Sequence, residues 1–286
     1  MADVLVSVIT PALNAGPFIG RTLASVASQS YALLEHIVVD GGSTDETAAI
    51  VGRDSSVRLI EAPGLLQAAA VNRGISEAQG EIIVILNADD ILYPGAIEAL
   101  VAGLEDPHAV AVYADGVHID ETDRVLAPYA TADFNPSLLM ESCYICQPAS
   151  AIRRAAFLDV GGMNPSLDIA LDYDLWIRLS RHGRFRRIHG TLAGSRMHRA
   201  NKTLARRVEV YHESIRVLHD HYGYVPYTWT YAYACWHLYQ KDGFFELPPR
   251  TKFSVLLSLG LGVWLNPRQP LRAVRDWYRH RAIGRR

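Results

Sequence analysis

The stretch Glu81-Ile-Ile-Val-Ile-Leu-Asn-Ala-Asp-Asp90 joins an apolar run to a cluster of polar side chains. An unbroken run of Ile and Val is typical of a strand inside a parallel sheet, where both faces are covered. Open α/β sheets bind ligands at the carboxyl ends of their strands, which is where Asp89 and Asp90 fall. Carboxylate oxygens suit Mg²⁺ or Mn²⁺, ions that commonly complete their shell with substrate phosphates. The stretch predicts a metal site for a nucleotide diphosphate, unless the two aspartates cap a helix beginning near Pro94.

The region around this strand alternates short β-branched runs with amphipathic helical stretches, as repeated βαβ units do. Ser43 and Glu46 have the spacing of a capping box, which predicts a helix directly after the second strand. From residue 203 onward almost all of the sequence has a helical pattern. We therefore expect an α/β domain over residues 1–203 and a helical region over 204–286. The expected strands are 5–10, 36–39, 57–61, 81–86, 110–113, 116–119, 184–188 and 192–198.

Composition restricts the class of protein. The 286 residues carry a formal net charge of -2, which excludes a strongly basic nucleic-acid binder. Three cysteines form no secretory disulfide pattern, and the N-terminus lacks the basic start and long apolar run of a signal peptide, so we expect a cytoplasmic protein. The apolar segment 253–265 is shorter than the roughly 20 residues of a membrane-spanning helix.

The end of the chain has a different charge balance. From Pro267 onward the acid Asp276 stands against a series of arginines, interleaved with Trp277 and Tyr278. This pattern predicts a peripheral contact with an anionic membrane surface, an acidic partner or a second copy of the chain. The alternative is a terminal helix with a solvated, charged outer face. The arginines are Arg268, Arg272, Arg275, Arg279, Arg281, Arg285 and Arg286.

Three loops, at residues 11–14, 40–45 and 87–90, follow strands that should share one parallel sheet, so they should converge. No Gly-x-Gly-x-x-Gly follows the first strand and no Walker-type loop is present, which disfavours a dehydrogenase or an ATPase. A nucleotidyltransferase would need a glycine-rich loop with basic residues near the N-terminus, which is also missing. Asp40 can accept a hydrogen bond from a base or a ribose hydroxyl, or it can begin a helix cap.

Several segments together resemble family 2 glycosyltransferases of the GT-A fold. They include Ser7-Val-Ile-Thr-Pro-Ala-Leu-Asn14, Val38-Val-Asp-Gly-Gly-Ser-Thr-Asp45 and Leu171-Asp-Tyr-Asp-Leu-Trp176, and their order and spacing carry the resemblance. The match spans roughly residues 5–203. It implies a Rossmann-like, mostly parallel central sheet flanked by helices, followed by the helical C-terminal region. The other matching segments are 67–74, 80–90, 147–154 and 160–179.

The resemblance also implies roles for single residues. Asp40 would hold the nucleotide base, and the sugar nucleotide would contact Asp89 together with the residues Pro11, Leu13, Asn14, Gln67 and Asn72. The metal, Mn²⁺ or Mg²⁺, would be held by Asp89, Asp90 and His198. Three positions depart from the family pattern, where acids are commoner: Asn87, Ala69 and Leu171. A site with Asn87 has one charge fewer and should hold its ion more weakly.

Asp172 matches the place of the family's catalytic base. Asp174 is the competing carboxylate, and helix capping is the alternative role for Asp172. The implied reaction is metal-dependent and inverting: a sugar passes from a nucleotide-diphosphate donor to a hydroxyl of a glycan or lipid-linked acceptor in surface polysaccharide biosynthesis. A second hypothesis, suggested by the three departures, is a catalytically weak sugar-nucleotide-binding subunit of a glycan assembly complex.

Overall fold

The structure is a computed structural model that describes residues 4–241, 244, 246 and 248–280. The chain forms two compact units. The first contains the residues up to Phe134 and those from Tyr144 to Ala205, and the second contains Asn135–Cys143 and the residues from Arg206 onward. The boundary expected from sequence, between residues 203 and 204, assigned segment 135–143 to the first domain, whereas the structure groups it with the second unit.

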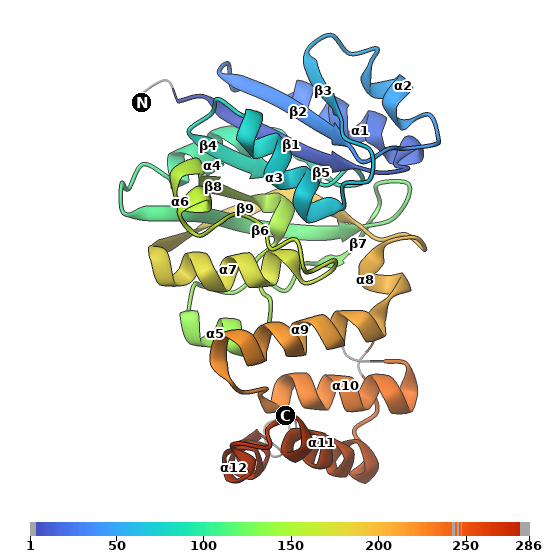
Figure 1. The fold of residues 1–286 in the computed structure, drawn as a ribbon, viewed down its shortest axis with the longest axis vertical. Helices are drawn as coiled ribbons and strands as arrows, with labels where there is room; N and C mark the ends of the chain where they lie inside the picture. The colour runs from blue at the N-terminus through green and yellow to red at the C-terminus, as the bar shows by residue number, and fades with distance from the viewer. Residues whose placement is uncertain (1–3, 242–243, 245, 247, 281–286) are drawn as a thin grey trace. The chain divides into compact units, whose positions relative to one another are not determined.

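The first half of the first unit is built from βαβ repeats (Figure 1). Strands β1, β2, β3 and β4 pair in parallel in the order β3-β2-β1-β4. Their side chains are mostly aliphatic, and β1 is buried along its whole length because helices cover both faces of the sheet. The elements are β1 (Val6–Ala12), α1 (Gly16–Ala27), β2 (Leu34–Asp40), α2 (Thr47–Val51), β3 (Val57–Glu61), α3 (Gln67–Glu77) and β4 (Ile82–Ile85).

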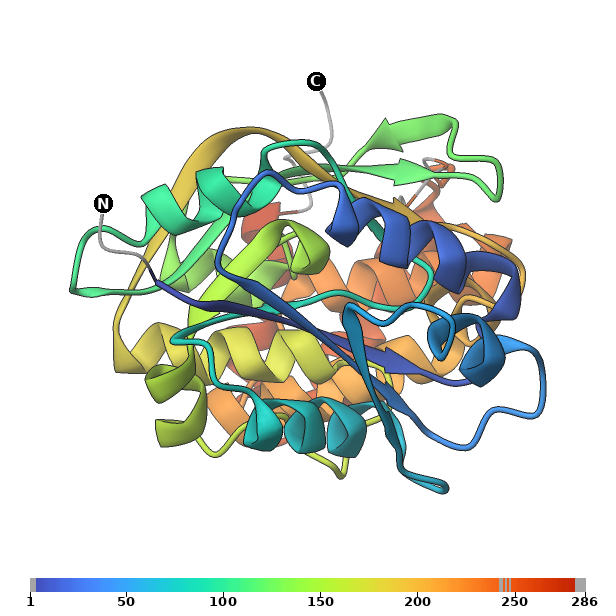
Figure 2. The same ribbon diagram turned by 90° about the horizontal axis from the view of Figure 1, so that it is seen from above.

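The second half extends the same sheet with mixed pairing. Strand β8 is antiparallel to both β4 and β6, whereas β9 is parallel to β6, giving the order β3-β2-β1-β4-β8-β6-β9-β5. Seen from above, α1 and α4 lie over one face of the sheet, and α3 and α7 lie over the other (Figure 2). The elements are β5 (Ile91–Leu92), α4 (Ala96–Gly103), β6 (Ala109–Ile119), β7 (Val125–Pro128), a 3-10 turn (Gln147–Ala149), β8 (Ser150–Arg153), α6 (Arg154–Asp159), α7 (Leu171–His182), β9 (Arg184–Arg196) and α8 (Lys202–Ala205).

This architecture confirms the GT-A-type α/β class, and three local expectations are corrected. The two strands expected at 110–113 and 116–119 are one strand, β6, and those expected at 184–188 and 192–198 are one strand, β9. Polar residues and Gly190 lie inside these strands, where the β6–β9 pairing shifts register. They interrupt the apolar sequence pattern, but each strand continues through them. Ser43 and Glu46 form no capping box: α2 begins at Thr47 without a side-chain cap.

The second unit is helical throughout its described residues. Its elements are α5 (Pro136–Glu141), α9 (Arg207–Tyr222), α10 (Tyr227–Tyr239), α11 (Lys252–Leu265) and α12 (Pro270–His280). Asn266, between the last two helices, is buried and bonds the backbone of Val225 in both directions, which fixes the start of α10 against the end of α11. Of the predicted C-terminal arginines, Arg281, Arg285 and Arg286 lie outside the described residues.

Candidate functional site

The three predicted loops leave the same edge of the sheet. In the parallel register Ala12 lies beside Asp40, and Ile9 lies beside Ile85. The N–H of Leu86 extends this pairing by donating to the carbonyl of Ile9 at 2.9 Å. The segments that follow β1, β2 and β4 are therefore neighbours, as the parallel sheet predicted.

Asp40 ends β2 and is buried, with its carboxylate turned toward its own loop. It accepts from the backbone N–H of Ser43 at 3.1 Å and from the Ser43 hydroxyl. Since α2 begins only at Thr47, Asp40 does not cap that helix. Gly42 has a φ of 98°, and a Cβ on Gly41 would lie 2.7 Å from the carbonyl oxygen of Leu65. The conformational freedom of the glycine pair is thus used for a tight turn.

The loop after β1 is hydrogen-bonded to the loop after β2. Asn14, in the left-handed conformation, accepts from the N–H of Thr44 at 2.9 Å, and its own N–H donates to Ser43 at 2.8 Å. Pro11 is buried beneath this rim, whereas Leu13 is 52% exposed on it. The loops after β1 and β2 therefore form one hydrogen-bonded rim, with Leu13 and Asn14 exposed and Pro11 and Asp40 buried beneath it.

Asn87 is the centre of an amide network. Its oxygen accepts from Gln67 at 2.9 Å, and its NH₂ group donates to Asp90 at 3.1 Å and to Gln147 at 3.2 Å. The amide of Asn72, by contrast, bonds the backbone of Met163 through both its oxygen and its nitrogen, at 2.8 Å each. The structure therefore uses Asn72 to join α3 to the loop near Met163 and uses Gln67 to hold Asn87.

Asp89 and Asp90 have different environments. Asp90 is 3% exposed, and its oxygens accept from the backbone N–H of Arg196 at 2.8 Å and from Asn87. Burial and the nearby charge of Asp89 raise the pKa of Asp90 well above its usual range. Neither aspartate caps the following helix, because β5 intervenes and α4 begins at Ala96 with Gly95 in the N-cap position.

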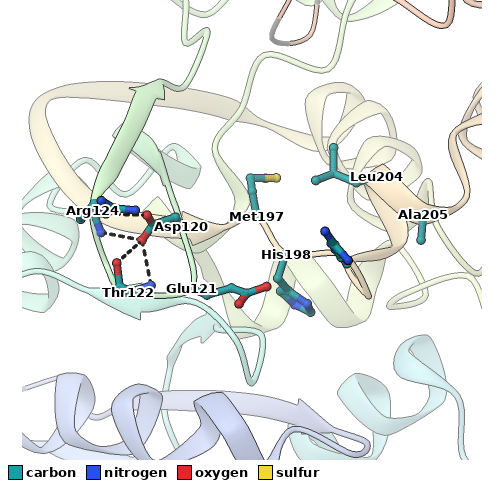
Figure 3. Close-up of a pocket in the computed structure, with 9 residues that line it drawn as sticks. Asp120, Glu121, Thr122, Arg124, Met197, His198, Leu204 and Ala205 are labelled. Carbon is teal, nitrogen blue, oxygen red and sulfur yellow. Dashed lines mark hydrogen bonds and ion pairs between the residues drawn. The ribbon is translucent and has the colours of Figure 1, made fainter.

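Asp89 is the partly exposed member of the pair and meets His198. Its Oδ2 lies 3.0 Å from Nε2 of His198, whose ring packs on Phe18 with centroids 4.6 Å apart. His198 also lines an open pocket of about 510 Å³, between the Asp120–Arg124 turn and the end of α8 at Leu204 and Ala205 (Figure 3). The turn is held by Asp120, which accepts from Thr122 and Arg124. The His198 side of the pair is thus accessible from this pocket.

The donor set of Asp89 and His198 fits a divalent ion. A carboxylate oxygen and an imidazole nitrogen are donor atoms that Mn²⁺ and Mg²⁺ accept, and here the two lie 3.0 Å apart. Among the residues that the structure describes, no group of three His, Cys, Asp or Glu side chains could hold a metal. Asp89 and His198 are in contact, whereas the oxygens of Asp90 accept from Arg196 and Asn87, and the predicted set of three ligands stays a prediction.

Arg196 was not identified from sequence and is the main support of the aspartate loop. Its side chain is fully buried, donates to the carbonyl oxygens of Asp89 and Asp120 at 2.7 Å each, and forms an ion pair with Asp123. Its guanidinium also lies over the Phe18 ring, 5.2 Å from the centroid. A single arginine thereby fixes the backbone that presents Asp89. A buried arginine at a strand end has no periodic signal that would reveal it.

Asp172 is the second residue of α7, and Ala170 occupies the N-cap position, so Asp172 is not the capping residue. Its oxygen accepts from the N–H of Tyr173 at 2.8 Å. Burial raises the pKa of Asp172 to about 6. Asp174 is instead bound to Arg178, at 2.6 Å and 2.9 Å. Of these two carboxylates, Asp174 forms the ion pair with Arg178 and Asp172 does not.

The pKa of Cys146 is influenced by carboxylates of two different elements. This buried thiol has its pKa raised by burial, then by the charge of Asp90, and further by those of Asp172 and Asp115. The carboxylates of Asp90 and Asp172, which lie on different elements, thus both contribute to the electrostatic environment of this thiol.

Comparisons with known proteins identify the family of this chain. Residues 7–161, more than half of the chain, match the family described as Glycosyl transferase family 2. The chain is 33% identical over 184 residues to the O-antigen biosynthesis protein RfbC of Myxococcus xanthus, covering 62% of this chain and 14% of RfbC. It is 29% identical over 206 residues to a chondroitin synthase of Pasteurella multocida, covering 70% of this chain and 21% of that enzyme. The chain thus spans a small part of both relatives.

Solved structures share the fold. TarS residues 1–349 of S. aureus, in complex with UDP, has a TM-score of 0.64 at 17% identity, covering 93% of this chain and 82% of that one. The mannosyltransferase PcManGT of Pyrobaculum calidifontis, in complex with GDP-Man and Mn²⁺, has a TM-score of 0.60 at 20% identity, covering 98% and 76%. With the family match over residues 7–161, the sheet-edge loops and the α7 carboxylate in place, the chain belongs to glycosyl transferase family 2.

Proposed function

We propose that this glycosyltransferase is an inverting enzyme that transfers a sugar from a nucleotide-diphosphate donor to a hydroxyl group of a surface glycan or its lipid-linked precursor. The observation that carries the proposal is Asp172, a carboxylate at the start of α7 whose pKa is raised to about 6 and which forms no ion pair with Arg178. A base with a pKa near the working pH is ionised and still accepts a proton readily. The name of RfbC supports a role in surface polysaccharide assembly.

The donor would bind along the rim formed by the loops after β1 and β2. Asp40 lies at its base, Pro11 lines it, and Leu13 and Asn14 form its outer edge. The complexes of TarS with UDP and of PcManGT with GDP-Man support a nucleotide sugar as the ligand class. Asp40 accepts from Ser43 in this structure, and a carboxylate retains further acceptor capacity for a base or ribose donor.

Asp89 and His198 would hold the divalent ion beneath the donor diphosphate. A carboxylate and one imidazole leave most positions of an octahedral shell to phosphate oxygens and water, which is the usual arrangement for Mg²⁺ at phosphate sites. When bound, the ion supplies positive charge that stabilises the departing nucleoside diphosphate. The Mn²⁺ in the PcManGT complex supports this choice of ion.

The chain's own residues perform the proton transfer. Asp172 accepts the proton of the acceptor hydroxyl while that oxygen attacks the anomeric carbon from the face opposite the leaving group. The new glycosidic bond then has inverted configuration, and the nucleoside diphosphate departs with the bonding electrons. Arg196 keeps Asp89 in position through its bond to the Asp89 carbonyl.

A donor screen tests the proposal. Thermal shifts with UDP, GDP, UDP-GlcNAc and GDP-mannose, each with and without Mn²⁺, would identify the base and the need for metal. Release of the free nucleotide from the donor that binds would then report catalysis, with Asp172→Asn as the matched control. Binding without nucleotide release by the unaltered chain, even with a range of glycan acceptors, would refute catalysis and favour the non-catalytic subunit.

A further inference from the structure

Helix α11 has its large apolar side chains on the outside. Ser254, Ser258 and Gly262 are its buried residues, spaced four apart along one face. Phe253 and Trp264 are 76% and 72% exposed on the opposite face. Helices of water-soluble proteins place their large apolar residues inward. Leu256 and Leu257 complete the exposed apolar stripe of α11. We therefore expect this stripe to contact an apolar environment rather than water.

Helix α12 also exposes apolar side chains, and a row of arginines flanks them. Leu271, Val274 and Tyr278 are exposed and lie on one helical face, whereas Ala273 is buried. Arg272, Arg275 and Arg279 follow at helical spacing along the flank of that face. An apolar stripe beside a row of arginines is the pattern of a helix that lies in a membrane interface.

The two helices pack together, so that the stripes belong to one structural body. The indole N–H of Trp277 donates to the carbonyl of Val255 at 2.8 Å, and Ala273 lies 3.9 Å from a Cβ built on Gly262. The small residues on the inner face of α11 allow this close approach. We call the exposed residues of α11 and α12 the apolar face: Phe253, Leu256, Leu257, Trp264, Leu271, Val274 and Tyr278.

The surroundings of the apolar face are basic. Residues 248–280 include a lysine and five arginines, and their acid, Asp276, is partly buried, where it accepts from Tyr224 and from the N–H of Tyr227. A symmetric contact with a second copy would bring like charges together, because such an interface pairs one patch with itself. An anionic lipid surface offers the complementary charge and an apolar layer at once.

We infer that the apolar face docks on a lipid bilayer that contains anionic lipids, with α11 and α12 lying along its surface. No helix among the described residues is long and apolar enough to cross a membrane. The 14 residues of α11 extend about 21 Å, less than the roughly 30 Å of a hydrocarbon core, which agrees with a helix lying flat. This inference is independent of the proposed transfer reaction, since docking requires neither donor nor metal.

Vesicle flotation with the full chain tests the inference. We expect binding to vesicles of phosphatidylcholine mixed with phosphatidylglycerol, weaker binding to phosphatidylcholine alone, and weakening with added salt. Phe253→Ser combined with Trp264→Ser should reduce binding at least about tenfold, because two large apolar side chains no longer enter the interface. Arg275→Glu should reduce it roughly fivefold or more, and only for anionic vesicles.

Matched controls separate docking from general effects. Val125→Ser with Leu126→Ser removes two exposed apolar side chains from β7, and Arg53→Glu reverses an exposed charge elsewhere; both should bind as the unaltered chain does. Trp264→Phe should keep binding but lose quenching by brominated lipids. Failure of the unaltered chain to bind anionic vesicles would overturn the inference. So would unchanged binding by the Phe253/Trp264 variant, or a solution dimer that this variant dissociates.

Discussion

Replacing Asp172 by asparagine should make the protein more stable and almost inactive. Burial raises the pKa of this carboxyl from 3.8 to about 6, so the folded state disfavours the ionised form. The difference corresponds to about 3 kcal/mol of stability that is absent once the carboxyl is ionised. Asparagine carries no charge, and its oxygen can still accept from the N–H of Tyr173.

The sign of the pH dependence follows from the raised pKa. Between about pH 4 and pH 6 the unfolded chain binds fewer protons at this position than the folded chain, so folding stability falls as the pH rises. The Asp172→Asn variant should therefore melt close to the unaltered protein at pH 4. At pH 8 it should gain up to about 3 kcal/mol, a rise of several degrees in melting temperature for a protein of this size.

Activity should change in the opposite direction. A positioned general base contributes about 10²- to 10⁴-fold, so the variant should lose turnover by that factor while keeping donor affinity. In the unaltered enzyme about nine tenths of the carboxyl is ionised at pH 7 and about one tenth at pH 5, which predicts an acidic limb of kcat near pH 6. Calorimetry at both pH values and initial rates of nucleotide release measure these effects.

Asp174→Asn is the matched control, since it alters a carboxylate two residues away that forms a partly buried ion pair with Arg178. It should lower stability, because the arginine loses its partner. If Asp172→Asn melts at the same temperature as the unaltered protein at pH 8, the burial of Asp172 has been misjudged. If it retains near-normal turnover, another group is the base.

Four further outcomes follow from the aspartate loop. Asp89→Asn should lose at least about tenfold in Mn²⁺ affinity, measured by titration calorimetry with nucleotide present, whereas Asp90→Ala should lower stability by about 1–3 kcal/mol by leaving buried donors unpaired. Arg196→Met should lower stability by about 1–3 kcal/mol in chemical denaturation, because the carbonyl oxygens of Asp89 and Asp120 lose their donor; unchanged stability would remove its positioning role. Asn87→Asp should destabilise the fold by about 1–3 kcal/mol, since it replaces a donor to Asp90 by a second acceptor; a more stable variant would contradict the network.

Much of the fold could be predicted because its strands carry strong local patterns. The run before Asn87 formed a strand at the expected place, since an unbroken β-branched run has few alternatives to a buried strand. The segment 57–61 also formed its expected strand, although its pattern is mixed and it is only partly buried. The interrupted strands β6 and β9 were split in the prediction. Polar residues and glycine end most strands, and here long-range pairing between the two strands outweighed that local signal.

The roles of Asp40, Asp89, Asp172 and His198 rest on the resemblance and stay predictions. Their contacts could not be predicted from the sequence. Their partners come from residues far apart in the chain, such as Arg196, which reaches the carbonyl of Asp89. Such tertiary hydrogen bonds leave no periodicity, so the structure alone distinguishes a presented carboxylate from a buried one.

The hydrogen bonds of Asn87 explain why an amide, rather than an acid, occupies position 87. The oxygen of Asn87 accepts from Gln67 and its nitrogen donates to Asp90 and Gln147, so this side chain must both accept and donate. An ionised aspartate cannot donate, and it would stand against a carboxylate that is already buried. With Asn87 in the network and Asp90 bound to Arg196, Asp89 is the partly exposed carboxylate of the loop and lies 3.0 Å from His198. The amide at position 87 is therefore better understood as part of the network that holds Asp90 than as a loss of the site.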